Sequence, residues 1–249
     1  MRLVIQGKEN AMTYFYKTDE MAKNLAGAAY SSAAGAWVTG ERLIFGKMRM
    51  PAGTRSSAHA HANEQFGYCL AGSTRLNIEG DVHVLTPGHI AYRPANAVHE
   101  AEVLGDVDYE FIVAKDTATT IEGTPTEMKQ TAEHVPYFYD TEAMEKGLAG
   151  EAYSPTEGAW VTGERIIFGK MRIPAGCKAE LHSHPNEQFA IVLSGACRMT
   201  IGGEVETITA GDIAHMPANV VHSAEIVGDE DYVFVTAKDT SWGIQGIKA

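Results

Sequence analysis

Short runs of apolar residues, many of them alternating with polar residues, recur along the chain between glycine and proline positions. One run covers Leu43–Met50 and ends at Pro51. Runs of the same kind occupy residues 66–70, 75–78, 82–85, 90–93 and 109–114. Strand-length runs with turn residues every eight to twelve positions or so are typical of an all-β barrel or sandwich. Only two short stretches have a helical pattern, residues 19–25 and 142–148.

The chain contains an internal duplication with a period of 123 residues. Between Tyr14 and Thr117, 61 of 104 residues are identical to the residue 123 positions later, and no gap is needed. A repeat of about a hundred residues is long enough to close a core of its own, so the period indicates duplicated domains and not a solenoid. We expect an N-terminal barrel in residues 1–123 and a C-terminal barrel in residues 124–249. Residues 118–136, rich in Thr and Glu and containing two prolines, are the expected linker.

Histidine and glutamine residues recur in each copy at a spacing that suits metal binding. Side chains alternate along a strand, so His59 and His61 point the same way, and Gln65 shares their parity. Two imidazoles at this spacing can converge on one cation, and His99 on a later strand would be a fourth ligand. The second copy repeats the set as His182, His184, Gln188 and His222.

Two sequence blocks in each copy resemble the two motifs of the cupin superfamily. The first block runs from Gly53 through His59, His61 and Gln65 to Gly72, and the second runs from residue 87 to His99. Two such pairs in one chain resemble a bicupin, which implies two tandem cupin barrels of the double-stranded β-helix (jelly-roll) type. Carried over by position, the family's ligands fall on the eight His and Gln residues named above. The resemblance implies a divalent metal ion (Mn, Fe, Ni, Zn or Cu), one per barrel.

The glutamines depart from the cupin pattern, in which most metal-binding members have glutamate at that position. Glu64 and Glu187 lie one residue earlier, and strand alternation should turn them to the opposite face. With Gln as ligand all four donors are neutral, so the cation keeps its full charge and acts as a Lewis acid on an anionic oxygen. Gln in the ligand set resembles cupins that linearise unsaturated uronates and cupin hydroxynitrile lyases.

Other interpretations of these residues stay open. The six histidines could be core or surface residues spaced by accident, or one barrel could have lost its metal. Tyr92 and His215, at matching positions before a Pro-Ala turn, are candidate catalytic residues if they face the cavity; the alternative is a core tyrosine and a solvated histidine. Small side chains at Gly67 and Cys69 predict a roomier first barrel, since Val192 fills more of the second.

Composition and charge narrow the partners. A net charge of −12, with no run of Lys or Arg, argues against nucleic acid. The chain has no apolar stretch of about 18 residues to span a membrane, and the apolar run in residues 1–7 is too short for a signal peptide. Three cysteines without CxxC spacing fit a reducing cytoplasm. Further association into a homo-oligomer is left open.

Three functions are compatible with these features. The first is a metal-dependent bicupin enzyme that uses its cation as a Lewis acid on a small, oxygen-rich, anionic metabolite, in lyase, isomerase or hydrolase chemistry. The second is an iron- or copper-dependent dioxygenase that cleaves a phenolic or diketone substrate. The third is a non-catalytic protein that binds a small ligand.

Overall fold

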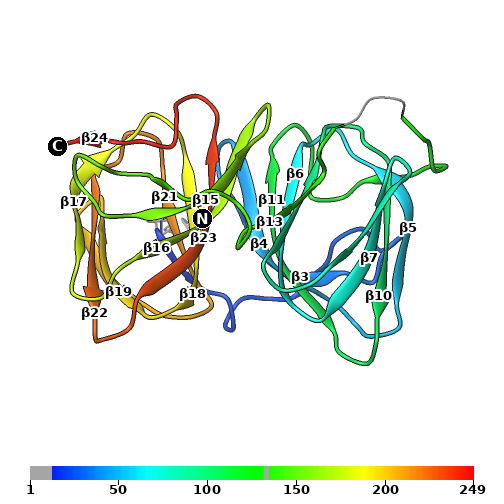
Figure 1. Ribbon diagram of the computed structural model, residues 1–249, viewed down its shortest axis with the longest axis horizontal. Coiled ribbons are helices and arrows are strands. Elements are labelled where there is room, and N and C mark those ends of the chain that lie inside the picture. Colours follow the sequence, from blue (N-terminus) through cyan, green and yellow to red (C-terminus); the bar gives the residue numbers. More distant parts are fainter. Residues whose placement is uncertain (1–12, 132–134) are drawn as a thin grey trace, which may run out of the picture.

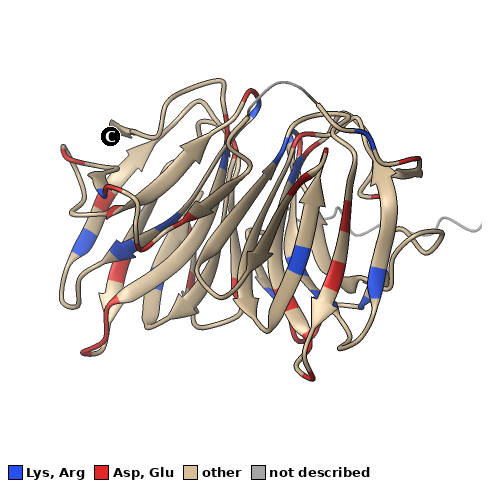
Figure 2. Cartoon of the chain, turned by 45° about the vertical axis from the view of Figure 1, so that its right-hand side comes forward, with Lys and Arg blue, Asp and Glu red and all other residues tan. Residues whose placement is uncertain are grey.

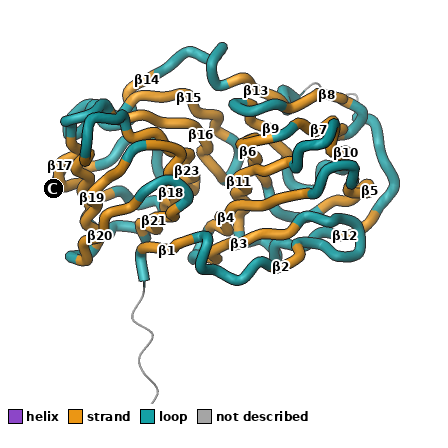
Figure 3. The backbone as a smooth tube through the Cα atoms, turned by 90° about the horizontal axis from the view of Figure 1, so that it is seen from below, coloured by secondary structure: helices purple, strands orange, loops and turns teal. Residues whose placement is uncertain are grey.

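The computed structural model describes residues 13–131 and 135–249. These residues form β-strands, turns and loops, and none of them is helical (Figure 3). The strands build two barrels that lie side by side (Figure 1). Residues 1–7, on which the signal-peptide expectation rests, lie outside the described residues.

Each barrel consists of a seven-stranded and a five-stranded antiparallel sheet. The seven-stranded sheet of the first barrel has the order β13-β9-β6-β11-β4-β3-β2, and its five-stranded sheet has the order β12-β5-β10-β7-β8. The strands of the first barrel are β2 (Asn24–Leu25), β3 (Ala34–Thr39), β4 (Leu43–Met50), β5 (Arg55–Ala60), β6 (Gln65–Ala71), β7 (Ser73–Ile78), β8 (Asp81–Leu85), β9 (His89–Arg93), β10 (His99–Leu104), β11 (Tyr109–Asp116), β12 (Thr124–Pro125) and β13 (Phe138–Asp140).

The second barrel repeats this arrangement. Its sheets have the orders β1-β21-β18-β23-β16-β15-β14 and β20-β19-β22-β17-β24. Its strands are β1 (Phe15–Lys17), β14 (Gly147–Leu148), β15 (Glu157–Thr162), β16 (Ile166–Ile173), β17 (Lys178–Ser183), β18 (Gln188–Ser194), β19 (Ala196–Ile201), β20 (Glu204–Ile208), β21 (Asp212–Met216), β22 (His222–Val227), β23 (Tyr232–Asp239) and β24 (Ile247–Lys248).

The two copies exchange their first strands. β1 precedes the first barrel in sequence but pairs with β21 of the second, where Tyr16 lies opposite Ile213. β13 precedes the second barrel and pairs with β9 of the first, where Tyr139 lies opposite Ile90. β12, inside the expected linker, pairs with β5. The division of the chain at residue 123 therefore does not coincide with the division in space.

The helices expected at residues 19–25 and 142–148 are absent. In the first copy a turn, closed by the main-chain bond from Glu20 N to Lys17 O, is followed directly by β2. The second copy has the same turn, followed by β14. A seven-residue segment has too few hydrogen bonds to offset the cost of helix nucleation, so pairing with the neighbouring strand prevails over the local pattern.

The largest apolar core lies between the barrels. Phe45 stacks near Phe189 at a ring-centroid distance of 5.7 Å, and Phe66 lies 5.4 Å from Phe168. Alternate residues of the same strands, such as Met48 and Cys69, belong to the core inside the first barrel. Strands buried on both faces lose the polar positions of a half-exposed strand, which explains the nearly unbroken apolar run of residues 66–70.

Many strands carry charged residues on a solvent-exposed face. Figure 2 shows Lys and Arg interspersed with Asp and Glu along these strands. Pairs such as Arg75 with Glu102 and Lys47 with Glu110 join neighbouring strands. No helix in the described part of the chain is long and apolar enough to cross a membrane.

Candidate metal centres

Strand pairing brings the two sequence blocks of each copy together. β10 pairs with β5 so that His99 lies directly opposite His59, and β22 pairs with β17 so that His222 lies opposite His182. A tight turn before β10 reinforces this contact: Asn96 has a positive φ of 66°, which asparagine tolerates well, and its main-chain N donates to His61 O at 2.8 Å. The Pro-Ala-Asn sequence thus positions His99 beside the other two histidines.

All six histidines are held in one tautomer by the main chain. In the first barrel Nδ1 of His59, His61 and His99 donates to the carbonyl oxygens of Ser57, Asn63 and Ala97, at 2.8, 2.9 and 2.9 Å. The counterparts in the second barrel bond to Glu180, Asn186 and Val220 at 2.7, 2.7 and 2.9 Å. A carbonyl oxygen only accepts, so Nδ1 carries the proton and Nε2 has a free lone pair, as a metal ligand requires.

The free lone pairs gather inside each barrel. The ring centroids of His59 and His99 are 4.2 Å apart, those of His61 and His99 are 5.0 Å apart, and those of His59 and His61 are 6.3 Å apart. Bonds of about 2.0–2.1 Å from one metal ion to neighbouring rings put their centroids about 5 Å apart. The described residues hold no group of three or more His, Cys, Asp or Glu side chains already closed on a common point. Metal binding would therefore require the rings to move, above all His59 and His61, whose separation exceeds this distance.

Burial keeps these imidazoles neutral. It lowers the pKa of His59 to about 4 and that of His61 to about 3, and it lowers the pKa of His99 well below its ordinary value. The second barrel shows the same shifts. Nε2 of His61 and of His184 is buried without a hydrogen-bond partner in the described part of the chain. Neutral donors with unmet lone pairs suit a cation, so the residues present fit a divalent metal.

Each glutamine lines the same pocket as two histidines of its set, His59 and His99 in the first barrel and His182 and His222 in the second. Gln65 and Gln188 line the pockets of their barrels. In the second barrel Thr236 Oγ1 donates to Phe189 O at 2.8 Å and accepts from Gln188 Nε2 at 2.9 Å. With Nε2 engaged in this bond, the amide oxygen of Gln188 is the end that remains for a cation.

Glu64 and Glu187 point away from the cavities, as strand alternation predicts. Each carboxylate reaches the other barrel and accepts main-chain N–H bonds there. Glu187 accepts from residues 41, 42 and 43 at 2.9, 2.8 and 2.9 Å, and Glu64 accepts from residues 164 and 165 at 2.8 and 2.6 Å. Burial raises the pKa of Glu64. Burial acts the same way on Glu187, but hydrogen bonds from His215 and the main chain outweigh it and lower the pKa.

Tyr92 and His215 lie at this same contact between the barrels. Tyr92 hydrogen-bonds to Glu64 and belongs to the core between the barrels. His215 Nε2 is 2.7 Å from Glu187 Oε1, and its ring stacks on Phe189 at 4.2 Å. Neither residue lines the pocket of its barrel. We therefore assign neither of them a part in the chemistry of the cavities.

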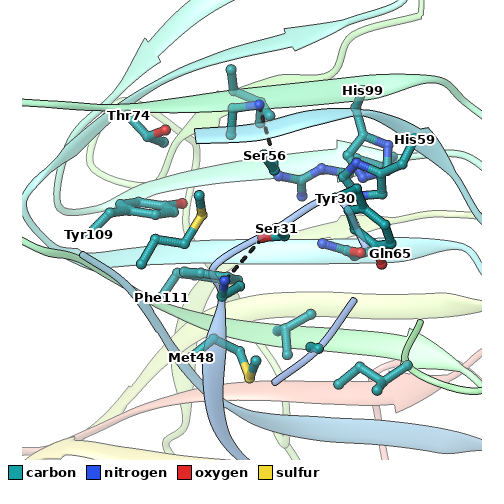
Figure 4. Close-up of a pocket in the computed structure, with 18 of the residues that line it drawn as sticks. Tyr30, Ser31, Met48, Ser56, His59, Gln65, Thr74, His99, Tyr109 and Phe111 are labelled. Atoms are coloured by element: carbon teal, nitrogen blue, oxygen red, sulfur yellow. Dashed lines mark hydrogen bonds between the residues drawn. The ribbon is translucent and has the colours of Figure 1, made fainter. Parts of the chain in front are cut away.

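Several pocket residues were not identified from the sequence. Tyr30 stacks on His59 at 4.0 Å, and its hydroxyl accepts from Gly123 N at 2.7 Å. Lys115 lies inside the first barrel and donates to Ile121 O at 2.6 Å. Figure 4 shows His59, His99, Gln65 and Tyr30 at one end of the pocket and Thr74, Tyr109 and Phe111 at the other. The second barrel repeats these positions with Tyr153 and Lys238.

Arg93 also lines the first pocket and is not among the residues predicted from the sequence. It follows Tyr92 on β9 and therefore faces the opposite way, into the first barrel. Gln65 lies directly opposite it on β6. Side chains directly opposite each other on neighbouring strands lie on the same face of the sheet. The cross-strand neighbour of the candidate ligand Gln65 is therefore the position from which Arg93 could have been predicted.

The two cavities have the same volume, about 70 Å³ each. The expectation of a roomier first barrel is therefore wrong. A Cβ on Gly67 would lie 3.3 Å from Nη1 of Arg93. The space that the small side chain leaves is filled by the guanidinium group.

The fold and the pockets define a class of protein: a duplicated jelly-roll protein with one histidine-lined cavity in each barrel. The family model "Cupin domain" matches residues 46–115 and 169–238, which is more than half of the chain. The chain belongs to the cupin family and is a bicupin.

Comparison with individual proteins agrees with this fold. Oxalate decarboxylase OxdC of Bacillus subtilis (strain 168) is 22% identical over 257 residues, which cover 78% of this chain and 66% of that protein. A structure of B. subtilis oxalate decarboxylase from work on its Mn(II) centres has a TM-score of 0.69 at 19% identity, covering 93% of this chain and 78% of that one. AerE from Microcystis aeruginosa has a TM-score of 0.68 at 17% identity, covering 83% and 92%.

Proposed function

We propose that the protein is a metal-dependent bicupin enzyme that uses a divalent cation as a Lewis acid on a small, oxygen-rich, anionic metabolite. One observation carries the proposal. In each barrel three histidines have Nδ1 bonded to the main chain and Nε2 free, beside a glutamine that faces the same cavity. Such a set supplies four neutral donors and leaves coordination positions for water or substrate.

The chain's own residues would hold the cation. Nε2 of His59, His61 and His99 with the amide oxygen of Gln65 form one set; Nε2 of His182, His184 and His222 with that of Gln188 form the other. A bound cation would polarise a carboxylate, carbonyl or alkoxide oxygen of the substrate. Tyr30 stacks on His59 and Tyr153 stacks on His182, each at a ring-centroid distance of 4.0 Å, and this contact keeps the two imidazole rings in place.

The pockets favour an anionic substrate. No Asp or Glu is among the described residues that line either one, while Lys115 lines the first and Lys238 the second. Burial lowers the pKa of each lysine to about 7, so each is partly charged at neutral pH. With neutral ligands around a +2 ion, a negatively charged substrate restores charge balance inside the barrel. The similarity to a decarboxylase of oxalate, a small dianion, supports the same substrate class.

The neutral ligand set also favours non-redox chemistry. An anionic ligand would stabilise a higher oxidation state of the metal, and none of the proposed donors is charged. We therefore place lyase, isomerase or hydrolase reactions ahead of oxygen-dependent ones. Mn(II) is the first metal to test, since the similar B. subtilis enzyme has Mn(II) centres. The three cysteines are free, which is in keeping with an enzyme of the reducing cytoplasm.

The test is the double variant His59→Ala, His182→Ala, with His83→Ala on the exposed strand β8 as the matched control. Each protein is loaded with Mn(II), its metal content is measured, and a panel of small carboxylates including oxalate is assayed with product analysis and an oxygen electrode. We expect turnover without oxygen uptake in the wild type and in the control, and loss of both metal and turnover in the double variant. Full turnover in the double variant, or turnover that consumes oxygen stoichiometrically, would refute the proposal.

A further inference from the structure

A buried cation with two unpaired nitrogens lies in the first pocket. Arg93 is only 7% exposed, and its Nε and Nη1 have no hydrogen-bond partner within the described part of the chain. An arginine can donate five N–H bonds and accepts none, so a buried guanidinium normally lies against a carboxylate or a group of carbonyls. Among the described residues, no carboxylate or carbonyl meets these two nitrogens.

The titratable groups around Arg93 do not offset its charge. Of the described residues, His59, His61, His99, Lys115 and Tyr109 interact electrostatically with it, and none of these is a carboxylate. Burial lowers the pKa of Arg93 to about 10, which still leaves it charged at neutral pH. A buried charge is costly unless it is paired and hydrogen-bonded. Burying the unpaired guanidinium therefore costs folding free energy. Packing alone does not require this charge, because an apolar residue would fit the same position.

The second copy shows what that apolar residue is. Met216 occupies the position of Arg93, and Ala190 occupies that of Gly67. A methyl group at residue 67 would lie 3.3 Å from Nη1 of Arg93, so the first barrel has glycine where the arginine needs room. The second barrel has alanine at the matching position, next to a methionine that does not need this room. The ligand residues, by contrast, are the same in both copies.

We propose that Arg93 is a substrate-binding residue that holds a carboxylate group in the first barrel, and that the second barrel lacks this anion site. Gln65 lies directly across the sheet from Arg93, so a carboxylate on the guanidinium sits beside the His and Gln set. The cavity of about 70 Å³ limits the ligand to a small mono- or dicarboxylate. This inference deepens the proposed function and rests on it for the role of the bound anion.

The experiment measures anion binding, not activity. Full-length protein, either loaded with Mn(II) or stripped with a chelator, is titrated calorimetrically with malonate and with its neutral analogue malonamide. Three variants are compared with the wild type: Arg93→Met, which copies the second barrel, Arg93→Lys, which keeps the charge but loses the planar fork, and the reciprocal double variant Ala190→Gly, Met216→Arg.

We expect the metal-loaded wild type to bind one malonate per chain tightly, in the first barrel where Arg93 adds to the cation, and to bind malonamide far more weakly; malonate held by the cation of the second barrel alone should bind more weakly. Arg93→Met should lower the affinity of the tight site roughly 100-fold with unchanged metal content, and Arg93→Lys should lower it roughly tenfold, because a bidentate charged contact is lost in the first case and reduced to a point charge in the second. The reciprocal variant should bind a second malonate tightly, which keeps the proposal testable if Arg93→Met does not fold.

Two results would overturn the inference: unchanged malonate affinity in metal-loaded Arg93→Met, or no malonate binding by metal-loaded wild type. The proposed function can fail separately. If the wild type takes up no metal but still binds malonate, and Arg93→Met abolishes that binding, the anion site stands and the metal-dependent function is refuted.

Discussion

In the second barrel a threonine hydroxyl determines which end of the Gln188 amide faces the histidines. Thr236 Oγ1 donates to Phe189 O and can therefore only accept from Gln188 Nε2. The first barrel has Val113 at this position, and a valine offers no such bond. The two sites thus share their proposed ligands but differ in how firmly the glutamine is oriented.

Replacing this threonine should weaken metal binding in the second barrel. Thr236→Val copies the first barrel and leaves the Gln188 amide free to rotate, and the loss of a group that orients a ligand lowers metal affinity by about 10- to 100-fold. Mn(II) titration in a His59→Ala background, where only the second site fills, measures the effect. The first site, measured in a His182→Ala background, is the control and should not change. Equal affinity with and without Thr236 would show that the hydroxyl does not act on the site.

At the scale of elements, the first residues of β6 and β18 link each cavity to the opposite barrel. Gln65 faces its own pocket, while the preceding Glu64 binds the main chain of the loop before β16; Gln188 and Glu187 do the same toward the loop before β4. The exchanged strands β1 and β13 add a second connection across the same boundary. The barrels should therefore unfold as one cooperative unit.

Removing either carboxylate should weaken that unit. Glu187→Gln keeps the shape but leaves a single neutral acceptor for three main-chain donors, and the lost charge-assisted bonds should reduce the free energy of unfolding by about 2–3 kcal/mol. Glu64→Gln should cost less, because burial raises the pKa of Glu64 and so already disfavours its charge in the folded protein. Urea denaturation measures the change, with Glu206→Gln on the exposed part of β20 as the control, expected within about 0.5 kcal/mol of the wild type. A loss confined to one separately melting barrel would contradict the cooperative account.

The strand exchange makes a directional prediction. A proline at the centre of β1 (Tyr16→Pro) removes a main-chain donor where the strand pairs with β21, so hydrogen exchange should accelerate in residues 212–216 of the second barrel. Tyr139→Pro in β13 should instead accelerate exchange in residues 89–93 of the first barrel. Faster exchange in the barrel that follows each strand in sequence would show that the strands pair within their own copy.

For the whole molecule, the duplication, the all-β class and the candidate ligands could be predicted, because they depend on period and parity. The exchange could not, since β1 and β13 both begin Phe-Tyr and either copy could accept either strand. The pattern leaves open whether Tyr92 faces the first cavity or the core; it belongs to the core, and the side chain that faces the cavity from β9 is the next one, Arg93. Tyr92 turns outward because the interface buries the outer face of that strand, and a single copy's pattern does not show that a second barrel covers it.

We propose that three histidines and one glutamine in each barrel share one cation. The most direct test is a crystal structure of the Mn(II)-loaded protein with anomalous scattering data. We expect one manganese peak in each barrel, bonded to Nε2 of His59, His61 and His99 and the amide oxygen of Gln65, and to their four counterparts in the second barrel, with at least one position open to solvent. Manganese bound elsewhere with both cavities empty, or glutamines turned away from the ion, would contradict it.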